Sequence, residues 1–190
     1  MRIGLLGGSF NPAHAGHRHV ADLACARLRL DQVWLLVSPG NPLKPQAGMA
    51  PFAARMESAR GIADGRRILA TGVEAVWHTR FTVDTVGLLR LRFPNASFVW
   101  LMGADILEQL PRWRRWTRIV RRLSFAVLPR PTYNHRALAS LAAHRLRCAR
   151  RPAREAPLLP GIAPGWVFLP APQNDLSATA LRAAIEGRVP

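Results

Sequence analysis

Residues 3–20 read IGLLGGSFNPAHAGHRHV, and this stretch decides the fold. A short apolar run, which we expect to be a strand ending at Leu6, leads into Gly7 and Gly8. The two glycines allow the backbone to approach a ligand closely or to take unusual dihedral angles. An amphipathic pattern then predicts a helix that begins near Ala15. A strand, a tight turn and a helix in this order form the repeating unit of a parallel α/β sheet.

The rest of the chain repeats this alternation. Apolar runs without a polar face predict strands that are buried on both sides, as in a parallel sheet covered by helices. The runs are IGLL (3–6), VWLLV (33–37), ASFVWLM (96–102), SFAVL (124–128) and GWVFL (165–169). Helical patterns occupy residues 15–30, 51–63, 82–92 and 177–186. We therefore expect an α/β fold with an open, doubly wound parallel sheet that binds ligands at the carboxyl ends of its strands.

The length of 190 residues suits one compact domain, so we expect a single domain over residues 1–190. Residues 131–165 are rich in Pro and Arg, and we interpret them as a basic excursion on that domain. A weak helical pattern around residues 136–149 lies inside this excursion.

Other features of the sequence bear on the cellular compartment of the protein. No apolar run is long enough to cross a membrane, and we interpret the N-terminal MRIGLLGG as a first strand rather than a cleavable signal. The two cysteines, Cys25 and Cys148, show no disulfide or zinc spacing. These features predict a cytoplasmic, reduced protein with no membrane partner.

The formal net charge of +16 raises the hypothesis of nucleic-acid binding. The excess of arginine is concentrated in residues 111–122 and 130–157. No recognition motif or aromatic–basic repeat accompanies it, so nucleic acid is not the partner that we expect. We interpret the charge mainly as a solvated basic surface, with a site for anionic small molecules explaining part of it. A basic nucleic-acid-binding protein stays open as the alternative of a different class.

The two histidines His14 and His17 should lie on the first turn of the helix, on roughly one face, with Gly16 keeping the space beside them open. The N-terminus of a helix also presents unpaired N–H groups and the positive end of its dipole. Two imidazoles added there form a donor cluster suited to a phosphate whose charge is changing. The glycine spacing is not that of a dinucleotide-binding loop, and the Lys-Ser/Thr ending of a P-loop is absent. Half of a metal site and a solvated histidine pair are the alternatives on spacing alone.

A second anion-binding pattern lies near the end of the chain, in LSATALR (176–182). Ser177 is a good N-cap, Thr179 adds a hydroxyl in the first turn, and Arg182 follows one turn later with a guanidinium able to bind two phosphate oxygens. Taken alone, this pattern is more typical of an ordinary capped helix.

Together the two motifs resemble the signatures of a known superfamily. GGSFNPAHAGH resembles the G-G-(S/T)-F-(D/N)-P-x-H-x-G-H signature of nucleotidyltransferases with an H-x-G-H motif, and LSATALR resembles their I-S-(S/A)-T-x-x-R motif. The resemblance implies a Rossmann-like fold and transfer of a nucleotidyl group from a nucleoside triphosphate with release of pyrophosphate. It implies His14 and His17 as catalytic residues. For ATP and its phosphates it implies Gly7, Gly8, Ser9, Phe10, Gly16, Lys44, Gly103, Asp105, Ser177, Thr179 and Arg182.

Three intervening segments are similar to one branch, the bacterial nicotinate-nucleotide adenylyltransferases. They are SPGNPLK (38–44), TRFTVDT (79–85) and VWLMGADILEQLPRWRRW (99–116), with Phe81 where that branch usually has Tyr. The similarity covers roughly residues 2–130 and 166–186. It implies ATP and nicotinate mononucleotide as substrates, with deamido-NAD and pyrophosphate as products. It also implies Mg²⁺ carried with the ATP rather than by a protein metal site. The sequence leaves a homo-oligomer open. Another H-x-G-H transferase with a different phosphate acceptor is the nearer alternative.

Several of these residues suit their implied roles chemically. Asp105 follows a buried strand, where a carboxylate can hold ribose hydroxyls, although a cap aspartate would look the same. Lys44 stands in a Pro- and Gly-containing loop able to close over phosphates, or it is a solvated lysine. Trp113 offers a flat face for a pyridine ring, or packs in the core, where we place Trp116. The resemblance further implies that backbone N–H groups near Thr82 and just after Trp113 bind the acceptor's carboxylate.

Overall fold

The computed structural model describes residues 1–40 and 47–170. Lys44, Ser177, Thr179 and Arg182, together with the helix expected over residues 177–186, lie outside the described residues. Within them the chain forms a seven-stranded sheet in which every strand pairing is parallel. The strands are β1 (Arg2–Gly8), β2 (Gln32–Val37), β3 (Ile68–Thr71), β4 (Ser97–Gly103), β5 (Ser124–Leu128), β6 (Arg150–Arg151) and β7 (Trp166–Phe168).

The strand order is β3-β2-β1-β4-β5-β7-β6, so the chain winds outward from β1 in one direction and then returns to continue from β4 in the other. This reversal makes the gap between the carboxyl ends of β1 and β4 the topological switch point, where open α/β sheets bind their ligands. The expected doubly wound parallel sheet is confirmed, and all five apolar runs form strands. Two strands were missed: β3 is only four residues long, and β6 is two arginines at the edge of the sheet.

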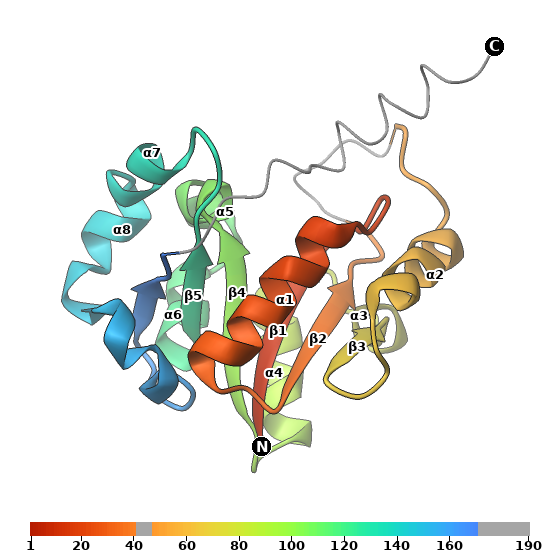
Figure 1. Cartoon of the computed structure of the whole chain (residues 1–190), viewed down its shortest axis with the longest axis horizontal. Coiled ribbons are helices and arrows are strands. Elements are labelled where there is room, and N and C mark those ends of the chain that lie inside the picture. Colours follow the sequence, from red (N-terminus) through yellow and green to blue (C-terminus); the bar gives the residue numbers. More distant parts are fainter. Residues whose placement is uncertain (41–46, 171–190) are drawn as a thin grey trace.

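Helices cover both faces of the sheet (Figure 1). The α-helices are α1 (Ala15–Leu28), α2 (Phe52–Ile62), α3 (Val73–Val76), α4 (Thr82–Arg92), α5 (Ala104–Gln109), α6 (Trp116–Arg122), α7 (Asn134–Leu138) and α8 (Leu141–Arg145). Three short 3₁₀ helices join them: η1 (Leu110–Arg112), η2 (Arg147–Ala149) and η3 (Ala153–Leu158). The helices expected over residues 15–30, 51–63 and 82–92 are therefore confirmed as α1, α2 and α4.

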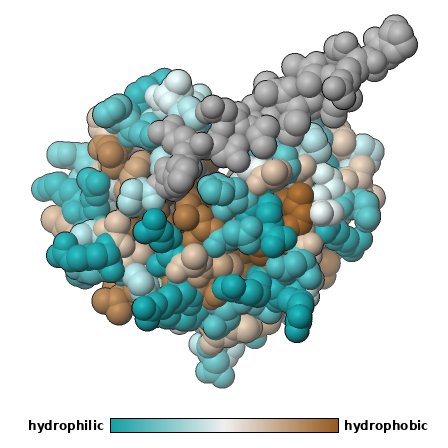
Figure 2. Space-filling model, viewed as in Figure 1, coloured by the Kyte–Doolittle hydropathy of each residue, from teal (hydrophilic) through white to brown (hydrophobic). Residues whose placement is uncertain are grey.

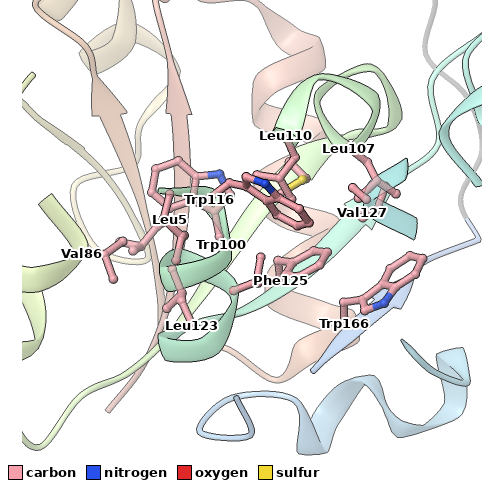
Figure 3. Packing of buried hydrophobic residues seen from close by; sticks show 14 of the residues in the cluster. Leu5, Val86, Trp100, Leu107, Leu110, Trp116, Leu123, Phe125, Val127 and Trp166 are labelled. Carbon is pink, nitrogen blue, oxygen red and sulfur yellow. The ribbon is translucent and has the colours of Figure 1, made fainter. Parts of the chain in front are cut away.

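The core is divided by the sheet into two apolar clusters. Alternate residues of each central strand enter opposite clusters: Ile3 and Leu5 pack on the side of α4 to α8, and Leu6 packs on the side of α1 and α2. Figure 3 shows the larger cluster, where side chains of β4, β5 and β7 meet those of α4 to α6. Trp116 is buried there, as expected. The two buried faces explain why the strands show no polar alternation.

The glycines at the end of β1 differ from the expectation. The strand does not end at Leu6 but continues through Gly7 and Gly8, which pair with Leu36 and Val37, and neither glycine has a positive φ. Their role is steric. A Cβ at Gly7 would lie 2.8 Å from the ring of Trp100, which is closer than real Cβ contacts. The absent side chain thus makes room for an indole rather than for an unusual turn.

Residues 131–165 form more structure than the weak helix expected around residues 136–149. They fold into α7, α8 and the 3₁₀ helices η2 and η3, and they add β6 to the edge of the sheet. The indole Nε1 of Trp166 in β7 donates to the carbonyl oxygen of Leu146 at 2.9 Å, which ties the segment to the sheet.

The surface is predominantly polar on the face that Figure 2 displays, with hydrophobic patches between the hydrophilic ones. Among the residues that the structure describes, no helix combines the length and apolar character needed to cross a membrane.

Candidate active site

The two histidines of the motif meet at the start of α1. His14 is the N-cap and His17 the third residue of the helix, and their ring centroids lie 3.9 Å apart. The helix begins at Ala15, as expected. In Figure 1 both α1 and α5 begin at the arrowhead end of the sheet, beside the switch point between β1 and β4. The predicted proximity of the two imidazoles is confirmed.

A reciprocal pair of hydrogen bonds fixes both rings. Nδ1 of His14 accepts from the backbone N–H of Gly16 at 3.2 Å, and Nδ1 of His17 accepts from the backbone N–H of His14 at 3.3 Å. A nitrogen that accepts a hydrogen bond carries no proton, so each neutral ring carries its proton on Nε2. Each ring is therefore an Nε2–H donor. Burial, followed by the positive charge of Arg130, lowers the pKa of His14, which favours this neutral form at pH 7.

These bonds change one expectation about the helix N-terminus. The first amides of α1 are not all left for a ligand, because Gly16 N–H donates to Nδ1 of His14 and His17 N–H donates to the carbonyl oxygen of His14 at 2.9 Å. The imidazole Nε2–H groups add donors at this end of the helix.

Phe10 packs against His17, and the neighbouring Ser9 is held by Arg55. Phe10 has a positive φ of 49° and is only 2% exposed, and its ring centroid lies 4.9 Å from that of His17. The Phe10 ring is thus a packing surface for His17, and contact between Phe10 and a phosphate would be through its backbone. The carbonyl oxygen of Ser9 accepts a hydrogen bond from Arg55.

Asp105 lies at the end of β4, in the first turn of α5. Its side chain is 15% exposed, and Oδ2 accepts from Nη1 of Arg130 at 2.9 Å. Oδ1 is buried and has no hydrogen-bond partner among the described residues, so it is an acceptor suited to a hydroxyl group. A Cβ at Gly103 would lie 2.5 Å from Oδ1, so only glycine allows the carboxylate to fold back over the strand end.

Arg130 is a site residue that sequence reasoning missed. It follows the end of β5 by two residues, and its backbone N–H is held by Oδ1 of Asn134 at 2.7 Å. Its charge contributes to the lowered pKa of His14, which follows β1, and its guanidinium binds Asp105, which follows β4. Arg130 therefore interacts with residues from both sides of the switch point. The available signal was its position after a buried strand at the carboxyl edge; the arginine-rich surroundings hid it.

Thr82 and Trp113, the residues expected at the acceptor, come from neighbouring segments. Thr82 is the first residue of α4, whose first N–H groups have no acceptor inside the helix. Trp113 is half-buried and packs edge-on against Trp100, with ring centroids 5.8 Å apart. The Arg114 guanidinium carbon lies 4.6 Å from the ring centroid of Phe81, which brings the two segments together.

Two threonines of the TRFTVDT segment hold that loop in place. Thr85 is fully buried, and its Oγ1 donates to Oε1 of Glu74 at 3.0 Å and lies 2.9 Å from Oγ1 of Thr79. Burial raises the pKa of Glu74, against the opposing hydrogen bonds from Thr85 and Ser38. Glu74 is a second residue that sequence reasoning did not single out.

Comparison with known proteins places this geometry in a family. Residues 5–184 match the model of the cytidylyltransferase-like family. The chain is 63% identical over 185 residues to a protein of Gluconobacter oxydans, covering 96% of this chain and 94% of that one. It is 62% identical over 184 residues to a protein of Gluconacetobacter diazotrophicus, covering 96% and 86%. Both relatives bear the name "probable nicotinate-nucleotide adenylyltransferase".

The fold is also found in a solved structure. The nicotinic acid mononucleotide adenylyltransferase of Plasmodium falciparum, complexed with NaAD, superposes with a TM-score of 0.72 at 17% identity, covering 96% of this chain and 82% of that one. At that identity the likeness concerns the fold alone, whereas the bacterial relatives are similar in sequence over nearly the whole chain. The chain belongs to the cytidylyltransferase-like family and, within it, to the nicotinate-nucleotide adenylyltransferases.

Proposed function

We propose that the chain transfers the adenylyl group of ATP to nicotinate mononucleotide, giving deamido-NAD and pyrophosphate in the synthesis of NAD. The names of the bacterial relatives support this reaction over a transferase with another acceptor and over a non-catalytic nucleic-acid-binding protein. The observation that carries it in the structure is the pair of imidazoles at the sheet's switch point whose Nδ1 atoms both accept from backbone amides, so that the ring proton of each neutral imidazole lies on Nε2.

The chemistry needs donors rather than a base. An oxygen of the mononucleotide's phosphate, already an anion, attacks the α-phosphorus of ATP; the bond to the oxygen bridging to the β-phosphate breaks, and its electron pair leaves with pyrophosphate. No proton has to be removed from the nucleophile. Catalysis is therefore positioning plus stabilisation of charge that moves to the leaving oxygen. His14 and His17 are suited to donate to the α-phosphate and the bridging oxygen.

The remaining roles follow from chemical type. Oδ1 of Asp105 would accept from a ribose hydroxyl, while the hydrogen bond from Arg130 to Oδ2 orients that carboxylate. Lys44, Ser177, Thr179 and Arg182 would hold the phosphate groups, and Thr82 and Trp113 the acceptor. Gly8 and Gly16 would keep the space beside the phosphates open, whereas Gly7 and Gly103 would act through the side chains for which they leave room, Trp100 and Asp105.

Mg²⁺ is the divalent cation that we propose for this reaction. Among residues 1–40 and 47–170 no cluster of three or more His, Cys, Asp or Glu could hold a metal ion. The phosphate oxygens of ATP are ligands that Mg²⁺ prefers, and it would be carried with them. When bound, it would neutralise part of the phosphate charge.

The deciding experiment measures pyrophosphate release from ATP with the purified chain against a panel of acceptors. The panel contains nicotinate mononucleotide, nicotinamide mononucleotide, phosphopantetheine and choline phosphate. We expect turnover with nicotinate mononucleotide and its product at the mass of deamido-NAD. Turnover with one of the last two acceptors alone would assign the chain to another branch, and no pyrophosphate with any acceptor would contradict an adenylyltransferase.

A further inference from the structure

Arg55 is a charged residue in the interior of the molecule. It lies in the first turn of α2 and is only 3% exposed. Its guanidinium donates four hydrogen bonds, and every acceptor is a backbone carbonyl oxygen. Nε donates to Ala50 at 3.0 Å, Nη1 to Ser9 at 2.8 Å and Ser38 at 2.7 Å, and Nη2 to Pro39 at 3.2 Å.

No carboxylate compensates this charge within residues 1–40 and 47–170. Burial lowers the pKa of Arg55 for that reason, although an arginine stays protonated. A buried unpaired cation is costly, so a residue of this kind is expected to have a role that an apolar side chain could not fill. The planar fork of five N–H donors is suited to joining several carbonyl groups at fixed positions.

The four carbonyl groups belong to three separate segments. Ser9 lies in the loop between β1 and α1, Ser38 and Pro39 directly follow β2, and Ala50 precedes α2. The loop from β1 is held at two further points from the same side. Oδ1 of Asn11 accepts from Ala50 N–H at 3.1 Å, and Ala13 N–H donates to Oγ of Ser58 at 2.8 Å.

The points that are held all lie in the loop directly before the two histidines. Ser9 precedes Phe10, whose ring packs against His17, and Ala13 precedes His14. We propose that Arg55 is a positioning residue, which fixes the loop of residues 9–13 against the end of β2 and so sets where the His14 and His17 imidazoles stand. Its effect on turnover rests on the proposed function, whereas its effect on the two rings does not.

The test is Arg55→Lys. This substitution keeps the positive charge but replaces the planar guanidinium, with five N–H donors, by an ammonium group with three. We expect the imidazole NMR resonances of His14 and His17 to shift, while those of His135 and His144, in α7 and α8, stay in place. We further expect kcat to fall about tenfold or more, because sub-ångström misplacement of donors is expensive in the transition state. KM for nicotinate mononucleotide should change less than about twofold, since its proposed site lies elsewhere.

Arg60→Lys is the matched control. Arg60 is on the same helix, is 65% exposed on its side chain and contacts only Glu57 through its charge among the described residues, so kcat and the His14 and His17 resonances should be unchanged. Ser58→Ala provides a second, uncharged change to the same loop, and it decides the matter if Arg55→Lys does not fold. We expect it to move the same two histidine resonances and to lower kcat a few-fold.

A folded Arg55→Lys protein with native histidine resonances and native kcat would overturn the proposal. So would a loss of kcat explained entirely by the unfolded fraction, measured by thermal unfolding of the same samples. If the native chain proved inactive with nicotinate mononucleotide, the proposed function would fall, but the histidine resonances would still test the role of Arg55.

Discussion

Arg130 and Asp105 form an ion pair between the carboxyl ends of β4 and β5, with Nη1 of the arginine 2.9 Å from Oδ2 of the carboxylate. The arginine belongs to the segment after β5 and the aspartate to the start of α5 after β4, so the pair joins two neighbouring strand ends. Burial lowers the pKa of His14, and the charge of Arg130 lowers it further. One guanidinium therefore orients the proposed ribose acceptor and favours the neutral form of a proposed phosphate donor.

Arg130→Met should lower kcat/KM for ATP by about 10- to 10²-fold, because hydrogen bonds to charged groups contribute about 1.5–3 kcal/mol. It should also raise the pKa of His14, since a nearby positive charge disfavours the imidazolium. Steady-state kinetics and an NMR titration of His14 measure the two effects. Arg136→Met is the matched control, because Arg136 pairs with Glu108 at 2.7 Å in the same way but on the exposed surface. An unchanged His14 pKa in Arg130→Met would contradict this arrangement.

His17→Ala should lower kcat by about 10²–10³-fold with little change in ATP affinity, because a donor to charge that grows in the transition state contributes mainly to turnover. Single-turnover kinetics and equilibrium binding of a non-hydrolysable ATP analogue separate the two quantities. His144→Ala, at an exposed position in α8, should retain native values. Near-native turnover in folded His17→Ala would remove the residue from the catalytic step.

The lowered pKa of His14 predicts a pH dependence of stability. Between its ordinary value of 6.5 and its lower folded value, the unfolded chain binds more protons than the folded one. The free energy of unfolding is thus unaffected by His14 above about pH 6.5 and falls as the pH drops below it. His14→Asn retains a cap acceptor but does not titrate, so its free energy of unfolding should fall less between pH 7.5 and 5.5. Urea denaturation of both proteins at the two pH values measures this, and equal pH dependence would contradict it.

The sequence was sufficient for the features that depend on local pattern. Apolar runs without alternation predicted the central strands because a parallel sheet is buried on both faces, and the motif around His14 predicted the start of α1. The features it missed depend on distant partners. Nothing local distinguishes Arg55 from the many arginines of this chain, and only its position after a buried strand marks Arg130, since burial and pairing arise when several loops meet. For the same reason Gly7 was interpreted as a turn residue, although its neighbour is Trp100 from another strand.

The last prediction concerns the choice of acceptor. The acid and amide mononucleotides differ only in a carboxylate or carboxamide on the ring, so discrimination requires donors without acceptors facing that group. The first turn of α4 at Thr82 and the backbone after Trp113 are suited to supply N–H groups, with the Trp113 indole beside the pyridine ring. Such donors can bind both oxygens of a carboxylate, but one of them would face the NH₂ group of an amide and stay unpaired. An unpaired buried donor costs about 1–3 kcal/mol. The hydrogen bonds to a charged carboxylate are also stronger than those to a neutral amide, which widens the difference.

We therefore expect kcat/KM for nicotinate mononucleotide to exceed that for nicotinamide mononucleotide by at least about 10²-fold. Trp113→Ala should lower kcat/KM for both mononucleotides, because it removes stacking that the two rings share, and should leave much of their ratio in place, because backbone groups set it. The exposed arginines beside Trp113 should add little, since their charges are screened: Arg112→Gln should change the ratio less than about threefold. Measurements of both substrates in one buffer test all three expectations. A ratio near one in the native chain would contradict donor-only recognition, while leaving the chemistry of His14 and His17 unaffected.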